Sequence, residues 1–330
     1  MPSLDVASAP PSATSGPNRP TRSNRTWIVP AATVAVVLQW ASAFVAIRQV
    51  GDTFSPGPLA LARLTVGSLA LAVLAVRVRR PLPRGKTLGL VLAYGVLWFA
   101  GYTVVLNAAE RHLDAGTAAL LVNFAPIIVA VLAGLFMGEG FPRPLMIGIV
   151  IAFAGVTLIA FGGSGGHSDG FGVTLGLVSA LLYAGAVLIQ KIALRSIDAV
   201  SATWIGCAAG TVALLGFAPQ TVDEVSRASA GAIVAVVYLG LFPTAVAFTL
   251  WAYALTRTDA GRMASTTLTV PAITVLMSWA VLSEVPTALA LLGGAMCLTG
   301  VAISRRRNGF RRSTPGRPPR GARRRRAANA

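Results

Sequence analysis

Charged residues are scarce in this chain of 330 residues. Asp, Glu, Lys and Arg together make up 12% of the sequence, hydrophobic residues make up 55%, and the mean hydropathy is +0.70. A soluble domain usually has about 25% charged residues, and the few charges present here cannot cover a folded chain of this size with a hydrated surface. The composition therefore excludes an ordinary soluble protein and indicates a membrane protein.

Cysteine and histidine are also rare, with two of each. Cys207 and Cys297 lie inside apolar segments, so no disulfide framework is indicated, and His112 and His167 fall in predicted loops. Neither an HExxH zinc motif nor a GxxxxGK[ST] phosphate-binding loop occurs. The sequence therefore gives no reason to expect an enzyme, a metal site, a cofactor or an ATP-driven pump.

The net charge of +17 comes largely from one end of the chain. Eleven of the 28 basic residues lie after residue 304, in a stretch of Arg, Pro and Gly that predicts a disordered tail over 305–330. We expect this tail to lie near anionic lipid headgroups, with binding of RNA or protein by the tail as the alternative. The charge is not spread over a folded face, and no nucleic-acid partner is expected.

Residues 1–26 are rich in Pro, Ser and Thr and lack an apolar core. They predict a disordered cytoplasmic leader rather than a secretory signal, with an organellar transit peptide as the alternative.

Apolar segments of about 20 residues, enough to cross a hydrocarbon core of about 30 Å, recur along the chain. Backbone groups cannot be hydrated inside lipid, so all of them are predicted to be helices. The result is an all-α polytopic membrane protein. The ten predicted transmembrane helices cover residues 28–49, 58–76, 87–107, 115–137, 144–163, 171–190, 201–218, 231–254, 262–282 and 287–304.

Basic residues are distributed unevenly over the predicted loops. With both termini in the cytoplasm, 24 of them fall in inner segments and only Arg111 and Arg227 in outer loops; Arg48 and Arg63 lie within spans. Cytoplasmic loops carry an excess of Lys and Arg. We therefore predict a multi-pass protein of the cell (inner) membrane with both termini cytoplasmic.

The two halves of the chain repeat each other at a spacing of 145 residues. Between residues 114 and 158, ten of 45 positions are identical to the position 145 residues later. Apolar residues of two helices often match by chance, but Pro, Glu, Gly and Asp would not all keep the same register by chance. The main identities pair Asp114 with Asp259, Pro126 with Pro271, Glu139 with Glu284, Gly148 with Gly293, and Gly155 with Gly300.

Each half has five predicted spans, residues 27–163 in the first repeat and 164–304 in the second. Because five is odd, the second half enters the membrane from the opposite side, and the repeats are inverted. Secondary transporters use such repeats for alternating access to a site near the midplane. The repeat therefore favours a carrier; a channel, or a scaffold that transports nothing, is the alternative from another class.

Pro126 and Pro271 lie near the middle of their spans. Each lacks an N–H group and frees the carbonyl four residues earlier, which favours a kink. A pair of bends at equal depth suits a cavity that opens alternately to each face, although kinks can also serve packing alone. Glu139 and Glu284 lie thirteen positions further on, about 20 Å along the helix. We interpret both as interfacial residues, with gating as the alternative.

Aromatic side chains near mid-depth are candidates for a solute site. Trp40 and Phe44 share one helix face, and Tyr94, Trp98 and Tyr102 share another. An aromatic-lined pocket suits a partly apolar solute, while a packing or lipid-facing stripe is the alternative. Three other tryptophans lie toward span ends and are assigned to an interfacial belt: Trp204, Trp251 and Trp279.

Polar groups within the spans are few. Asn123 precedes Pro126 by one turn, and Thr267 lies near the equivalent point of the ninth span; both can instead serve helix packing or bond their own backbone. Charge inside a membrane indicates function, so Arg63 is expected to attract a substrate carboxylate or phosphate if it faces the cavity. Snorkelling to the interface is the alternative, and it is the interpretation given to Arg48.

No Asp, Glu or His lies at the centre of any predicted span. The sequence therefore names no proton relay. Coupling through Glu139, Glu284 or Asp114 near the surfaces stays open, as does uncoupled facilitation or exchange.

These features resemble the EamA family of the drug/metabolite transporter superfamily: ten spans, two five-helix repeats and a Pro…Glu signature late in each half. Trp40, Phe44 and Arg63 are similar to that family's first repeat. The second repeat lacks an arginine equivalent to Arg63 and has Tyr183 in place of Trp40, so the halves are not expected to be equivalent.

The resemblance implies an exporter or exchanger of small metabolites, amino-acid-like or amphipathic, with a central cavity. A nucleotide-sugar or organic-phosphate exchanger of the same superfamily is the alternative, and it requires more than one cation in the cavity. A homodimer is compatible with the sequence, which leaves the oligomeric state open. The expected substrate pathway consists of Trp40, Phe44, Arg63, Trp98, Tyr102, Asn123, Tyr183 and Thr267.

Overall fold

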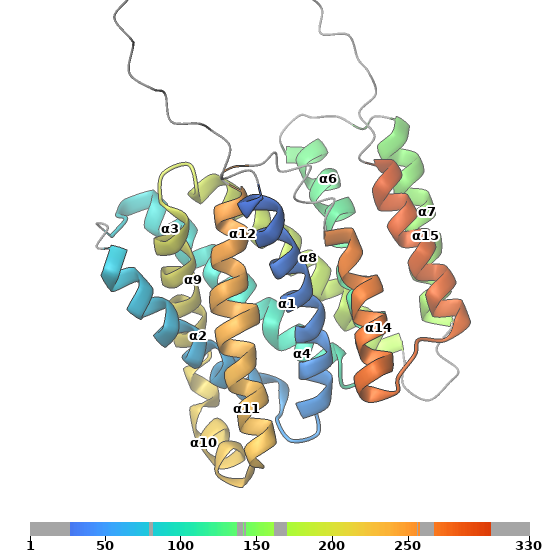
Figure 1. Ribbon diagram of the computed structural model, residues 1–330. Coiled ribbons are helices and arrows are strands. Elements are labelled where there is room, and N and C mark those ends of the chain that lie inside the picture. Colours follow the sequence, from blue (N-terminus) through green and yellow to red (C-terminus); the bar gives the residue numbers. More distant parts are fainter. Residues whose placement is uncertain are drawn as a thin grey trace, which may run out of the picture.

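The computed structural model describes residues 27–78, 82–136, 143–161, 170–255 and 267–304, together with Phe141 and Arg257. All regular elements in this part of the chain are helices, which confirms the all-α fold (Figure 1). The predicted tails 1–26 and 305–330, the predicted boundary between the repeats at 163 and 164, and Glu139 lie outside the described residues.

Helices occupy all ten predicted segments. The first half contains α1 (Ile28–Val50), α2 (Pro56–Val78), a third span made of α3 (Gly85–Gly95), η2 (Val96–Tyr102) and α4 (Thr103–Ala109), a fourth made of α5 (Ala115–Val122) and α6 (Ala125–Phe136), and α7 (Arg143–Phe161). The second half contains α8 (Gly170–Ala193), α9 (Ala199–Ala213), η3 (Leu215–Phe217), α10 (Ala218–Arg227), an eighth span made of α11 (Ala230–Leu239), η4 (Gly240–Val246) and α12 (Ala247–Leu255), a ninth made of η5 (Thr267–Thr269) and α14 (Val270–Leu282), and α15 (Ala288–Ser304).

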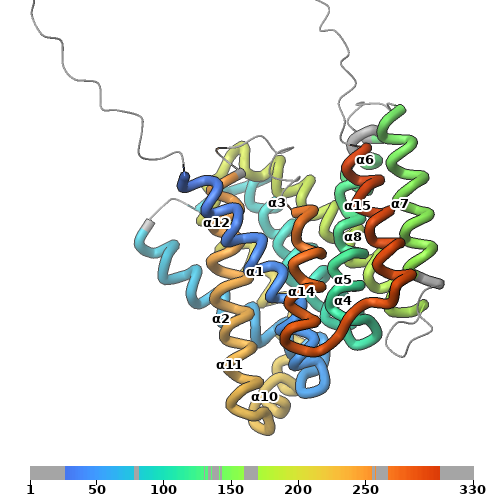
Figure 2. Tube along the Cα trace, turned by 45° about the vertical axis from the view of Figure 1, so that its right-hand side comes forward, coloured from blue at the N-terminus to red at the C-terminus, as the bar shows by residue number. Residues whose placement is uncertain are grey.

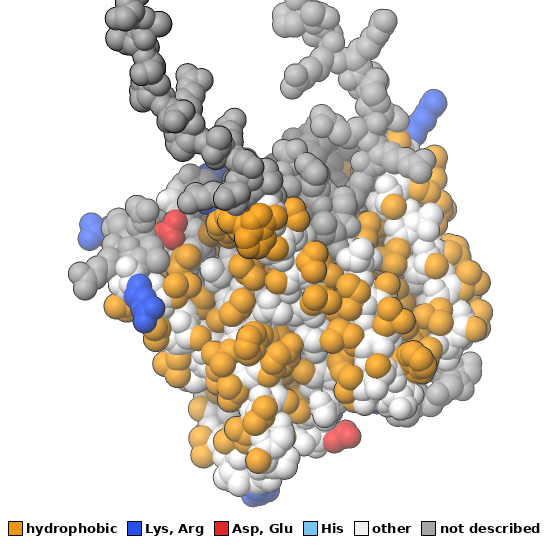
Figure 3. Space-filling view, viewed as in Figure 1, with side chains coloured by type: hydrophobic (Ala, Val, Ile, Leu, Met, Phe, Trp, Pro, Cys, Tyr) orange, Lys and Arg blue, Asp and Glu red, His pale blue; other side chains and the backbone are white. Residues whose placement is uncertain are grey.

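In the described part of the chain, five helical stretches are long and apolar enough to cross a membrane alone. A bent pair, Ala199–Ala213 with Leu215–Arg227, makes a sixth when it is counted as one span. The remaining four segments are shorter apolar helices. Large apolar side chains such as Val150, Phe153 and Leu276 are exposed on the outside. Figure 3 shows a broad apolar face with charged groups near its edges, as a bilayer-facing surface requires.

The start of α1 and the end of α15 lie at the same end of the bundle, with α10 at the opposite end (Figure 1). We call these the terminal end and the distal end. In both ribbon and tube views α7 and α15 stand side by side at one edge of the bundle (Figure 2).

The seventh span ends earlier than predicted. The sequence predicted a helix over 201–218, whereas α9 stops at Ala213 and the chain bends by 47° into η3 and α10. The amphipathic α10 is held against the start of α2, because Glu224 accepts hydrogen bonds from the backbone N–H (2.9 Å) and the hydroxyl of Ser55. A surface helix fixed by a contact with another span is not readable from hydropathy.

The inverted repeat is visible in the crossing of α7 and α15. Gly148 faces the backbone carbonyl of Gly300, and Gly155 faces that of Gly293. The contacts are so close that a Cβ on any of the four glycines would overlap the backbone of the opposite helix. Gly148 corresponds to Gly293 and Gly155 to Gly300, so exchanging the halves maps one contact onto the other. Such reciprocal contacts are what a twofold axis produces.

A second reciprocal contact lies nearer the centre. A Cβ on Gly95 would overlap the backbone of Gly206 in α9, and a Cβ on Gly240 would lie 2.6 Å from the carbonyl oxygen of Arg63 in α2. Gly95 and Gly240 are 145 residues apart, and Arg63 and Gly206 are 143 apart. The third span therefore packs on the seventh as the eighth packs on the second.

The third and eighth spans each contain a π-helix of seven residues at the equivalent place, η2 and η4. The hydroxyl of Thr244 donates to the carbonyl of Leu239, five residues earlier (2.8 Å). Pro243 lies inside η4 and has no N–H to donate. The sequence predicted regular helices here, and π-helical turns occur most often at functional sites.

Both mid-span prolines follow a break in the helix. Between α5 and α6 the regular bonding stops at Asn123 and Phe124, just before Pro126, and Pro271 lies in the first turn of α14 after the 3₁₀ turn η5. A proline tolerates the first turn of a helix but not its interior, since it lacks an N–H and clashes with the preceding turn.

Replacing Gly155 by Ala places a methyl group against the carbonyl of Gly293. We expect Gly155→Ala to lose about 1–3 kcal/mol of folding free energy through overpacking, measured by thermal unfolding of the purified protein in detergent. The matched control is Gly185→Ala in α8, where a Cβ meets nothing within 4 Å and alanine should stabilise the helix by about 0.5–1 kcal/mol. Equal melting temperatures for the two variants would contradict the close crossing.

Candidate functional site

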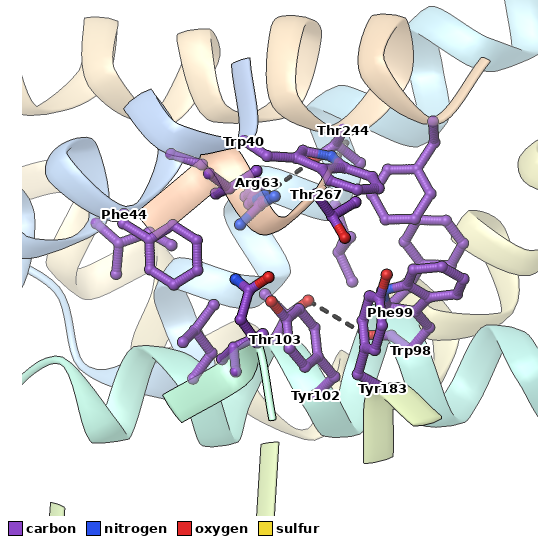
Figure 4. A pocket seen from close by; sticks show the side chains of 18 of the residues that line it. Trp40, Phe44, Arg63, Trp98, Phe99, Tyr102, Thr103, Tyr183, Thr244 and Thr267 are labelled. Carbon is purple, nitrogen blue, oxygen red and sulfur yellow. Dashed lines mark hydrogen bonds between the residues drawn. The ribbon is translucent and has the colours of Figure 1, made fainter. Parts of the chain in front are cut away.

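All eight residues predicted for the substrate pathway line one cavity between the two halves (Figure 4). Pro126 lines it as well, whereas Pro271 is buried in α14 and is not part of the lining. The remaining lining residues are Ala43, Ile47, Leu64, Phe99, Thr103, Leu106, Val122, Thr244, Phe248 and Val270.

The cavity is small and mostly apolar. The centres of water-sized molecules can occupy about 70 Å³ of it. One water needs about 10–15 Å³ by this measure, so the space holds several waters or the polar part of one small solute. A bound solute of this size would touch both halves at once.

Arg63 is the cationic group of the described lining. Its side chain is buried, with the residue 7% exposed, and its Nε donates to the hydroxyl of Thr244 at 2.8 Å. Arginine has five N–H donors, and the described residues offer no other hydrogen bond to it. Four donors on Nη1 and Nη2 are therefore left for a ligand, and the snorkelling alternative does not describe this side chain.

The equivalent position of the second repeat is filled differently. Gly206 stands where Arg63 stands in the first repeat, and the hydroxyl of Tyr94 lies 2.6 Å from the place a Cβ of Gly206 would take. Tyr94 donates to the carbonyl of Ala202 at 2.6 Å. The ring of Tyr94 thus occupies space that a second long side chain would need, which leaves the cavity with one guanidinium.

Aromatic rings form the side of the cavity nearer the terminal end. Trp98 contacts Tyr183 and Phe248 edge-on, each with ring centroids 5.0 Å apart. Tyr102 lies 5.9 Å from Tyr183, and Trp40 lies 5.7 Å from Phe248. Rings from the first, third, sixth and eighth spans therefore meet in one cluster.

The assignment of Trp251 to an interfacial belt is wrong. The residue is 5% exposed and its ring lies 5.0 Å from that of Trp40, so it packs inside the bundle against Trp40. Trp279, at 61% exposed, faces outward, and Trp204 is partly buried. The prediction rested on the depth of Trp251 along its span, and depth does not decide which face of the helix a residue occupies.

Asn123 and Thr267 lie at the two helix breaks, and both line the cavity. The Asn123 side-chain amide donates to the carbonyl of Ala119 in its own helix at 3.0 Å, and its backbone N–H reaches the same oxygen at 3.2 Å. Asn123 thus ends α5. Thr267 belongs to the 3₁₀ turn η5.

At the distal end an ion pair joins the two halves. Arg48 contacts Glu284 through Nη2 and Nε, each 3.1 Å from Oε1, and its Nη1 donates to the backbone carbonyl of Glu110 at 3.2 Å. Arg48 was expected to reach the membrane surface on its own, but its side chain is only 14% exposed. Ile47, the residue before Arg48, lines the cavity, so the ion pair lies next to the cavity wall on its distal side.

The lining residues that sequence reasoning missed include Phe99, Thr103, Thr244 and Phe248. Pro243 was the available signal, because it is a third mid-span proline and precedes Thr244 directly. Phe99 and Phe248 carry no such signal, since an apolar residue in an apolar helix is unremarkable until the packing is known. Among the described residues, no cluster of three His, Cys, Asp or Glu could hold a metal ion.

Two stretches of the chain, residues 27–161 and 170–306, match the model of the EamA-like transporter family. The chain belongs to this family. The match confirms the resemblance inferred from the repeats, and with it the drug/metabolite transporter superfamily. Members of the EamA-like family are transporters.

Curated relatives agree with this assignment over most of the chain. A protein of Streptantibioticus cattleyicolor named "Probable terminal-alkyne amino-acid exporter" is 37% identical, over 87% of this chain and 97% of its own length. "Uncharacterized transporter YdfC" of Bacillus subtilis is 34% identical, over 80% and 87%. A crystal structure with 17% sequence identity has a TM-score of 0.57, over 84% of this chain and 96% of that one, which supports the fold alone.

Thr244→Val removes the one hydroxyl that accepts from Arg63 and leaves the buried Nε–H without its partner. We expect a loss of about 1–3 kcal/mol of stability, measured by thermal unfolding in detergent. The control is Thr249→Val in the same span. The hydroxyl of Thr249 donates to the carbonyl of Ala245 in its own helix. A Thr244→Val variant as stable as the control would contradict the role of this hydrogen bond.

Proposed function

We propose that this EamA-family transporter is an alternating-access carrier that exports or exchanges a small solute with one carboxylate and an apolar remainder. The observation that carries the proposal is the lone guanidinium of Arg63, with four donors to spare, in an aromatic cavity between inverted halves. Amino acids and amphipathic acids have this combination of groups.

The wall around Arg63 suits such a solute. A guanidinium binds a carboxylate through two parallel hydrogen bonds, and the low dielectric of a buried site strengthens them. The rings of Trp40, Trp98 and Tyr183 offer an apolar surface to the rest of the molecule. Thr267 and Asn123 line the same cavity at the two helix breaks, where a bend of either half would change access.

The printed name of the Streptantibioticus relative supports the same class of solute. That name refers to export of an amino acid with a terminal alkyne, an apolar group. For the present chain we infer the class, an amino acid with an apolar side chain, and export as the direction.

A nucleotide-sugar or organic-phosphate exchanger is less well supported. A phosphate carries about −1.5 to −2 charges and calls for more than one cation. Arg63 is the only Lys or Arg in the described lining, and the site of a second one is taken by Gly206 and Tyr94. Saturable counterflow, which a channel does not give, separates a carrier from a channel of the same fold.

We also infer that the terminal end faces the cytoplasm of a bacterial-type inner membrane. The support is the excess of Lys and Arg on that side in the sequence, together with the shared end of α1 and α15 (Figure 1).

Arg63→Gln keeps a polar side chain but removes the charge. After a thermal-shift screen against amino acids, nucleosides, polyamines and amphipathic drugs has identified a solute, we expect Arg63→Gln to lower its affinity by about ten- to a hundredfold, from the 1.5–3 kcal/mol of a charged hydrogen bond. The measurement is counterflow in proteoliposomes. Arg77→Gln, at an exposed position of the same helix, is the control, and unchanged flux in Arg63→Gln would retire the proposed role.

The orientation predicts which side a polar thiol reagent reaches. Cys207 and Cys297 are fully buried, so the native chain is an unreactive background. We expect a membrane-impermeant maleimide to label Gly216→Cys, at the distal end, in intact cells. Ser196→Cys, exposed in the loop between α8 and α9, should react only after the cells are opened. The reverse pattern would overturn the assignment of the cytoplasmic side.

A further inference from the structure

Glu110 is the one carboxylate of the described chain that is buried with no partner on either oxygen. It directly follows the last residue of α4, it is 2% exposed, and neither Oε1 nor Oε2 has a hydrogen-bond partner. Asn107, one turn earlier on the same helix, also has an unpartnered buried side-chain oxygen. The end of α4 thus holds buried acceptors without donors, close in the chain to Leu106, which lines the cavity.

The nearest cation is committed elsewhere. The guanidinium of Arg48 reaches the backbone carbonyl of Glu110 but pairs its charge with Glu284. Asp114 accepts from the backbone and the hydroxyl of Thr117 as the cap of α5. The other ionisable groups around Glu110 are Arg63 of α2, Tyr102 of η2, the exposed Arg111, and His112, whose ring contacts Phe171 of α8.

A carboxylate in such a place has one way to avoid an unpaired buried charge, which is to hold a proton. Burial raises the pKa of the Glu110 carboxyl well above its usual range. Arg48 and Arg63 lower that pKa, and Glu284 and Asp114 raise it further, but burial is the larger effect. A protonated carboxyl also supplies the donor that the surrounding acceptors lack.

We propose that Glu110 is a proton-binding site built into the distal closure of the cavity, protonated while Arg48 pairs with Glu284 and deprotonated when that closure opens to water. The proposal rests on the alternating-access function proposed above, because it assigns a ligand to the state in which the cavity is closed toward the distal end. The ligand is a proton, which passes between the carboxyl oxygen and water at the distal face.

The geometry explains how the proton acts on the closure. Leu106 lines the cavity one turn before Glu110, and Ile47 lines it directly before Arg48, so the closure and the cavity share two helices. When Glu110 is neutral, Arg48 has a single anionic partner in Glu284. When Glu110 is ionised, a second carboxylate competes for the same guanidinium and the bond between the halves weakens.

The sign of the pH dependence follows from the raised pKa. The closed form binds one proton more than the open form, so acid at the distal face favours closure and alkali favours opening. Between the ordinary pKa of an exposed glutamate and the raised pKa of the closed form, a one-proton difference changes the open-to-closed ratio by up to tenfold per pH unit.

Infrared spectroscopy of the full-length protein tests the proton itself and needs no solute. We expect the wild type at neutral pH to show the carbonyl stretch of a protonated carboxyl group that is missing from Glu110→Gln. Glutamine matches the shape of a neutral glutamic acid, so this variant should fold; Glu110→Asp, which should shift the band rather than remove it, covers the case in which it does not. Identical spectra for wild type and Glu110→Gln would overturn the proposal.

Thiol accessibility tests the link to the closure. Ile47→Cys, reached by an impermeant maleimide from the distal side, is compared with Gly216→Cys, which is always exposed and corrects for the pH dependence of the thiol reaction. From about pH 6 to about pH 9 we expect the corrected labelling rate of Ile47→Cys to rise by up to tenfold per unit, and adding Glu110→Gln should hold it low at every pH.

Two outcomes of the labelling experiment would contradict the proposal. If the corrected labelling rate of Ile47→Cys does not change with pH while Glu110 is the native glutamate, no proton is linked to the closure. A rate that follows sodium concentration at constant pH means that the unpartnered oxygens bind a metal cation instead. If the infrared and labelling experiments both contradict the proton site but the protein still shows counterflow, the proposed transport function stands. Failure of the proton site is therefore distinguishable from failure of the transport function.

Discussion

Lipid supplies no hydrophobic force to hold helices together, so the bundle depends on direct backbone contact through glycine. Gly148 and Gly155 meet Gly300 and Gly293 where α7 crosses α15, and Gly95 and Gly240 bring the third and eighth spans onto their partners. Each contact has its counterpart under exchange of the halves. The cavity lies between the two repeats, and residues of both repeats line it, more of them from the first.

Within this symmetric frame the centre is asymmetric. Arg63 and Gly206 occupy equivalent places, yet one projects a guanidinium into the cavity and the other makes room for the ring of Tyr94. The two halves have equivalent backbone contacts, whereas the side chains at these two central positions differ. Under the proposed function, the single charge gives a solute one orientation, with its anionic group at Arg63 and its apolar part toward Trp98.

The structure treats its buried ionisable groups in two ways. Arg63 keeps its charge with one hydroxyl as a partner and open donors facing the cavity, as expected of a group that waits for a ligand. The carboxylate oxygens of Glu110 have no hydrogen-bond partner, and Arg48, which could have neutralised them, pairs with Glu284 across the repeat boundary. The proposed solute site and the proposed proton site are thus different, although Ile47 and Leu106 of the cavity wall lie next to the second one in the chain.

The sequence by itself determined the helical spans, the inverted repeat and eight residues that line the cavity, because hydropathy, a fixed spacing of 145 residues and the rarity of polar groups in apolar helices are all properties of the linear chain. It did not determine the π-helices, the place of Trp251 beside Trp40, the partner of Glu284 or the isolation of Glu110. Each of these depends on which helix face meets which neighbour, and hence on contacts between residues far apart in the chain. A loop glutamate and a buried, partnerless one read alike in sequence, since burial is decided only when the helices pack.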